Sequence, residues 1–71
     1  MNNELTKQTK IDIINQHIYS INTQIYNLDL TLQEEQAKEV PDLDRIEEIE
    51  SMRPDMIRVI NRLEEVLNEI N

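Results

Sequence analysis

The sequence contains no cysteine, no glycine, no tryptophan and no phenylalanine. Without cysteine, no disulfide or thiolate metal site can stabilise this chain of 71 residues, which is short enough that it buries little core of its own. Phosphate-binding loops and most tight turns are excluded as well, because they need glycine backbone with positive φ. The two tyrosines are the only aromatic residues, which argues against a compact globule with a large aromatic centre. Long helices are the natural alternative.

The chain also lacks long apolar runs. No stretch approaches the roughly 20 apolar residues of a membrane span, and the N-terminal residues MNNELTKQTK contain no apolar core of a signal peptide. We therefore expect no membrane partner. The location stays unknown, with the cytoplasm or a particle assembled there as the expectation. Because the chain starts with Met, we expect a complete short reading frame.

Basic residues are few, and the net charge is −8. This charge disfavours binding to nucleic acid or to anionic membrane surfaces. The charge is also unevenly placed, because residues 34–50 hold eight acidic and two basic residues, a balance of −6. Acidity is therefore a local feature of the middle of the chain.

Hydrophobic residues recur with the period of a helix. With Ile11 at heptad position a, every a and d position from 11 to 32 is Ile or Leu. A strand is the rival interpretation, since the segment is β-branched, but strict alternation would scatter Ile14, Ile18 and Ile25 over both faces. The heptad fits every position, so a helix is favoured.

The second half repeats this pattern. With Ile46 at a, the a and d positions up to Ile70 are apolar except Arg53, and Met52, Val59 and Val66 add a third column at g. This stripe is broader than a two-stranded coiled coil needs, so the second helix should face more than one neighbour.

Val40 and Pro41 separate the two patterns, because the residue before proline avoids helical conformation. We predict an all-α antiparallel hairpin, a single domain over residues 1–71, with helices at about 4–38 and 42–70. Asn3 is the expected cap of the first helix, and Asp42 or Asp44 the expected cap of the second. Pro54 should kink the second helix rather than end it, since the heptad phase continues unbroken.

One hairpin has a single contact line, which barely offsets the entropy lost on folding. We therefore expect self-association into a helical bundle, with a dimer of hairpins favoured and a trimer as the alternative. Isoleucine at both a and d favours trimers in parallel coiled coils. The predicted seam, which packs the helices within the hairpin and in the oligomer, comprises Ile11, Ile14, Ile18, Ile21, Ile25, Leu28, Leu32, Ile46, Ile49, Met56, Ile60, Leu63, Leu67 and Ile70.

Arg53 occupies a seam position, where an unpaired charge costs stability. If the turn centres near residue 39, antiparallel pairing brings Arg53 close to residues 25–29. Asp29 is the only acid in the middle of the first helix, so an Arg53–Asp29 ion pair is predicted, within one hairpin or between two. Alternatively, Arg53 extends its charged head to water along its aliphatic stem.

A second surface for a protein partner is predicted beside the seam. Residues 14–27 repeat one phrase, INQHIYS and INTQIYN, which contains no charged residue. An uncharged face of this kind is suited to contact with protein rather than with water, and tyrosine is typical of protein interfaces. The residues of this surface are Tyr19, Tyr26, Leu30, Met52, Val59 and Val66.

No pattern of residues indicates catalysis, a cofactor or a metal. His17 has no acid three or four residues away, so it is interpreted as a polar flank residue. The acids Glu34, Glu35, Glu39, Asp42, Asp44, Glu47, Glu48 and Glu50 lack the glycine turn of a calcium loop and are interpreted as a solvated hairpin tip. The protein is therefore not expected to be an enzyme.

Three functions remain. The first is a structural or assembly subunit that oligomerises and packs into a larger complex, with a viral or phage particle as one setting. The alternative is a soluble dimeric regulatory adaptor that binds a protein through its acidic tip or its tyrosines. The third is RNA binding. The expected dimer of hairpins resembles the Rop family of RNA-binding hairpin dimers in architecture alone. A basic patch would have to come from Lys7, Lys10, Arg58 and Arg62.

Overall fold

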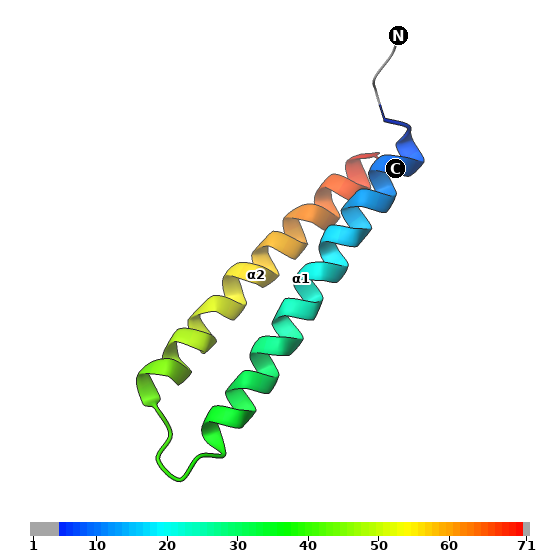
Figure 1. Ribbon diagram of the computed structural model, residues 1–71. Coiled ribbons are helices and arrows are strands. Elements are labelled where there is room, and N and C mark those ends of the chain that lie inside the picture. Colours follow the sequence, from blue (N-terminus) through cyan, green and yellow to red (C-terminus); the bar gives the residue numbers. More distant parts are fainter. Residues whose placement is uncertain (1–4, 71) are drawn as a thin grey trace.

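The computed structural model describes residues 5–70 and contains two helices, α1 (Lys7–Gln36) and α2 (Leu43–Ile70). They lie side by side and antiparallel, joined by a short turn at one end (Figure 1). The predicted all-α hairpin is therefore confirmed, and its helix boundaries lie within three residues of those expected.

The hairpin is a rod that is two helices thick. Its radius of gyration is 17.0 Å, whereas a compact chain of this length has a radius near 11 Å. The two short dimensions are 18 and 16 Å, which leaves no room for a third layer. All tertiary packing of the described residues is thus between α1 and α2.

The seam residues form the contact between the helices. Only three hydrophobic side chains in residues 5–70 are buried: Ile25, Ile49 and Ile60, with exposed fractions of 8%, 2% and 9%. The other eleven predicted seam residues are half-buried, and none is fully exposed. The 3.5-residue period therefore identified the face that joins the helices, but one partner helix covers that face incompletely.

Thr6 caps the start of α1. Its hydroxyl accepts a hydrogen bond from the backbone N–H of Thr9 at 3.1 Å, and its carbonyl accepts one from Lys10. Asn3, the expected cap, lies outside the described residues. Threonine satisfies a free N–H of the first turn as asparagine would, so the helix begins where this bond forms.

The turn is built without left-handed backbone. None of the described residues has positive φ, in agreement with the lack of glycine. The N–H of Ala37 closes α1 on the carbonyl of Gln33, and the carboxylate of Asp42 accepts the N–H of Arg45 at 3.1 Å. Asp42 is therefore the cap of α2, one of the two that the sequence offered.

α2 continues through Pro54 as one helix. Proline has no N–H to donate to the preceding turn, yet it keeps φ near the helical value, so the helix loses one hydrogen bond without ending. The heptad phase is preserved across it, which keeps Ile49, Met56 and Ile60 on the same face.

The burial of Ile49 generates a stability prediction. Ile49→Ala removes the most buried side chain of the seam and should lower the free energy of unfolding by about 2–4 kcal/mol. Ile57→Ala, the same change at a partly exposed site of α2, should cost less than about 1 kcal/mol. Urea denaturation followed by circular dichroism, at one protein concentration, measures both. Equal losses would contradict the observed seam.

Candidate interaction surfaces

One ion pair ties the two helices together among the described residues. The Nε of Arg53 donates to Oδ1 of Asp29 at 3.1 Å, within a single hairpin. This is the pair that the position of the turn predicts. Both side chains remain about half exposed, so Arg53 escapes the cost of a buried charge by reaching from its seam position to the edge. The pair also fixes which residues of α1 and α2 lie at the same height.

The acidic tip is more structured than a solvated charge cluster. Glu35 is buried, with 7% of its surface exposed, although we expected it to be solvated like its neighbours. Its Oε1 accepts the backbone N–H of Asp42 at 2.9 Å, and its Oε2 lies 2.7 Å from Nζ of Lys38. One side chain of α1 thereby holds the residue that caps α2.

The surroundings of Glu35 favour its charged form. The hydrogen bond from Lys38, followed by that from the N–H of Asp42, lowers the pKa of Glu35 below its ordinary value of 4.5, and partial desolvation opposes this shift. The positive charges of Lys38 and Arg45 act in the same direction as the hydrogen bonds. The expectation of a uniformly solvated tip was wrong for Glu35.

A sequence signal for Glu35 did exist. The heptad that places Ile11 at a places residue 35 at the next d position after Leu28, so Glu35 follows the seam into the turn. The apolar residues of the pattern end one position earlier, at Leu32. A charged residue at the last seam position before a turn can be a cap for the following helix rather than a surface residue.

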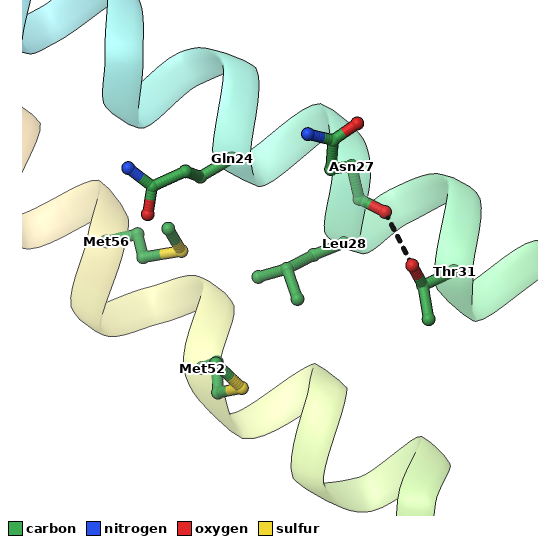
Figure 2. Close-up of a pocket in the computed structure, with 6 residues that line it drawn as sticks. All are labelled: Gln24, Asn27, Leu28, Thr31, Met52 and Met56. Carbon is green, nitrogen blue, oxygen red and sulfur yellow. Dashed lines mark hydrogen bonds between the residues drawn. The ribbon is translucent and has the colours of Figure 1, made fainter.

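A shallow groove of about 250 Å³ lies on one side of the hairpin. Figure 2 shows the six residues that line it: Met52 and Met56 of α2, with Gln24, Asn27, Leu28 and Thr31 of α1, of which Gln24 and Leu28 point toward the methionines. The polar residues of this lining are neutral, and the Thr31 hydroxyl donates to the Asn27 carbonyl at 2.9 Å. The groove therefore offers an apolar floor with no charge in its walls.

The groove belongs to a longer strip that we call the g flank. It consists of Met52, Val59 and Val66 from the g column of α2, beside His17, Gln24 and Thr31 from the g column of α1. Arg45 and Lys10 occupy the g positions just beyond this strip. Met52 and Val59 are 42% and 48% exposed, and Val66 is half-buried. An apolar column of this exposure is only partly covered by its own hairpin.

The tyrosines lie elsewhere. Tyr19 and Tyr26 are at heptad position b, which is on the Asp29 side of α1 rather than on the Gln24 side. They are 76% and 63% exposed, and Leu30 is also exposed. The predicted second partner surface is thus two surfaces on different sides of the hairpin, the g flank and a tyrosine flank.

The side of α2 opposite the g flank is charged. A groove of about 500 Å³ there is lined by Glu50, Arg53, Pro54, Ile57 and Arg58. The e column of α2 also contains Glu64, and the e column of α1 contains Asp29. The two long sides of the hairpin therefore differ in polarity.

The remaining candidate residues form no chemical site in the described part of the chain. His17 is exposed, and residues 5–70 contain no cluster of three or more His, Cys, Asp or Glu side chains that could hold a metal ion. Arg58 pairs with Asp55, and Arg62 pairs with Glu65 at 2.9 Å, so neither guanidinium adds net charge to a basic patch. Neither described helix is long and apolar enough to cross a membrane.

Comparisons with known proteins give no match to a family model, to a curated protein or to a solved structure.

Glu35 generates a prediction about pH. Because its pKa is lower in the folded than in the unfolded chain, its contribution to stability is present above the unfolded value near 4.5 and is lost as the pH falls through the folded value. Glu35→Gln keeps an oxygen for the Asp42 N–H but cannot titrate. We expect the free energy of unfolding to fall less steeply for this variant than for the wild type on acidification below pH 4.5.

Urea denaturation between neutral and acid pH measures this difference. Glu34→Gln is the matched control. Glu34 is the neighbour of Glu35 in the sequence, its side chain is exposed, and its substitution changes the net charge by the same amount. If the free energy of unfolding fell equally steeply with pH for the wild type and for Glu35→Gln, the charge of Glu35 would not contribute to stability.

The Asp29–Arg53 pair is tested by a double-mutant cycle. Asp29→Asn should cost about 0.2–1 kcal/mol in the wild type and nothing measurable in an Arg53→Met background, because the pair is half exposed. Chemical denaturation of the four proteins gives the coupling. An equal cost in both backgrounds would mean that the two side chains do not interact in solution.

Proposed function

We propose that this protein is a non-enzymatic assembly subunit, a small helical hairpin that self-associates and packs into a larger protein complex. The observation that carries the proposal is the incomplete seam: eleven of its fourteen apolar residues are only half-buried. Apolar side chains at this exposure gain free energy when a further helix covers them.

The exposed area of the chain supports the same conclusion. The whole chain of 71 residues exposes 5707 Å², whereas a compact monomer of 8.5 kDa exposes about 4,700 Å². The excess of about 1,000 Å² is close to the roughly 800 Å² that each partner buries in a standard interface. A rod of this kind has enough surplus surface for one stable protein contact.

The outer face of α1 supports packing against further protein. Residues 13–28 contain no Asp, Glu, Lys or Arg, whereas a helix that faces water usually carries mixed charges. Tyr19 and Tyr26 stand exposed on this helix, on the side away from the g flank. A subunit that uses one side for its own copies would keep this side for a different protein. A viral or phage particle is one setting for such a subunit.

A dimeric regulatory adaptor is the second candidate, favoured by the acidic tip. Residues 34–50 carry −6 of the net charge of −8, and Val40 and Leu43 are exposed among these acids. A basic partner would bind such a tip with salt-sensitive affinity. An adaptor needs a stable small oligomer before it meets its partner, whereas an assembly subunit gains much of its order from neighbours.

Light scattering and circular dichroism on the purified chain test the proposal. We expect a mass above the 8.5 kDa of one chain at high concentration, and a loss of both mass and helix on dilution. A fully helical monomer at every concentration would exclude self-association and with it the assembly function. An oligomer that keeps its mass and helix at high dilution would favour the adaptor.

A further inference from the structure

We propose that the g flank is the face on which a second copy of this hairpin docks, antiparallel to the first, with a twofold axis passing beside Val59 and Gln24. This inference rests on the self-association in the proposed function and adds the face and the orientation. Four observations carry it: the polarity of the two sides, the columns within the flank, the border charges and the charge of the tip.

The choice of side follows from charge. The g column of α2 between residues 52 and 66 is entirely apolar, and the g column of α1 from His17 to Thr31 holds no carboxylate, lysine or arginine. The opposite side presents Asp29, Glu50 and Glu64 in the corresponding columns. Desolvating the carboxylates of Glu50 and Glu64 would cost free energy, whereas covering Met52 and Val59 gains it.

The orientation follows from the columns within the flank. In a face-to-face pair with tips at opposite ends, the twofold axis lies across the rods, so α2 meets α2 and α1 meets α1 of the second copy. The apolar column of α2 then packs on the apolar column of the second hairpin, and the neutral polar column of α1 packs on the polar column of the second hairpin. With tips at the same end, α2 would meet α1, and Val59 and Met52 would be covered by Gln24 and Thr31.

The register of the hairpin allows a single axis to serve both helices. Val59 is the middle residue of the apolar column, and Gln24 is the middle residue of the polar column. Asp29 and Arg53 lie at the same height along the rod because their side chains are in contact. Gln24 is five residues from Asp29, and Val59 is six residues from Arg53 toward the same end of the rod, so Gln24 and Val59 lie at nearly the same height. Val59 then packs on Val59 of the second copy, and Met52 on Val66 of the second copy.

The charges that border the flank favour the same orientation. Asp55 and Arg62 lie at position c of α2, next to the g column. Within one hairpin Asp55 pairs with Arg58, and Arg62 pairs with Glu65. Antiparallel packing adds a second partner to each, because it brings Asp55 of one hairpin near Arg62 of the other. Glu48 and Glu69 lie farther out on this border and would face each other near the ends of the rod, where water screens them. Parallel packing would place α2 on α1 of the other hairpin, so Asp55 and Arg62 would lie near Asn27 and Ser20, which carry no charge.

The acidic tips act over a longer range. Each tip, residues 34–50, carries −6, and antiparallel packing separates the two tips by the length of the rod. Helices of 30 and 28 residues extend for about 42–45 Å, several Debye lengths at physiological salt. Parallel packing would place both tips at one end, where they would repel.

Cysteine cross-linking tests the orientation, because the chain has no cysteine of its own. A mixture of Met52→Cys and Val66→Cys chains should form a disulfide heterodimer under mild oxidation. Met52→Cys alone should form disulfides at least tenfold more slowly, because two Met52 positions lie about 20 Å apart across the axis and a disulfide needs α-carbons within about 7 Å. Rapid self-linking of Met52→Cys would overturn the antiparallel arrangement.

Charge substitution tests the face. Val59→Lys places two ammonium groups at the axis, so we expect the dissociation constant of the dimer to rise roughly 100-fold in sedimentation equilibrium. Ile57→Lys is the matched control on the opposite side of α2 and should change it less than about threefold. Because Val59 is half exposed, the monomeric hairpin should tolerate the lysine, and circular dichroism at high concentration checks its helix content.

The outcomes separate this inference from the proposed function. A wild-type chain that is monomeric throughout overturns both. Three results would overturn the g flank as the docking face and leave the assembly function standing. They are an oligomer that Val59→Lys leaves intact, a wild-type oligomer with the mass of a trimer, and the absence of a disulfide between Met52→Cys and Val66→Cys chains.

Discussion

The structure depends on one narrow hydrophobic contact between two helices. Helices that meet along a single line can bury only the residues that point directly at the line, and here these are Ile25, Ile49 and Ile60. Every other seam residue shares its surface with water. The rod shape, the excess of exposed area and the apolar g flank all follow from this shortage of partners, since no third element of the chain is present in residues 5–70 to supply one.

Electrostatics has two separate roles in the molecule. At the tip, Glu35 uses its charge locally, because its two oxygens hold the side chain of Lys38 and the backbone of Asp42 where a glycine turn would otherwise set the geometry. The remaining acids of residues 34–50 act at a distance by making one end of the rod strongly negative. The same segment therefore closes the hairpin and gives the rod a direction.

Periodic features could be predicted from the sequence, whereas features created by the turn could not. The seam and the Asp29–Arg53 pair follow from spacing alone, because helix geometry is regular and one turn position sets the register. The burial of Glu35 depends on how residues 37–42 fold back over the end of α1, and no local pattern encodes that path. The cap at Thr6 was missed for a different reason, since several polar residues near the start of the chain could each have capped the helix.

The location of the two chain ends has a consequence for anything attached to them. α1 begins and α2 ends at the same end of the rod, opposite the acidic tip (Figure 1). A polypeptide joined to either end therefore emerges away from the tip and, for the antiparallel pair that we propose, at both extremities of the dimer. Such a dimer would be a spacer of fixed length that holds two attached modules apart, one at each end.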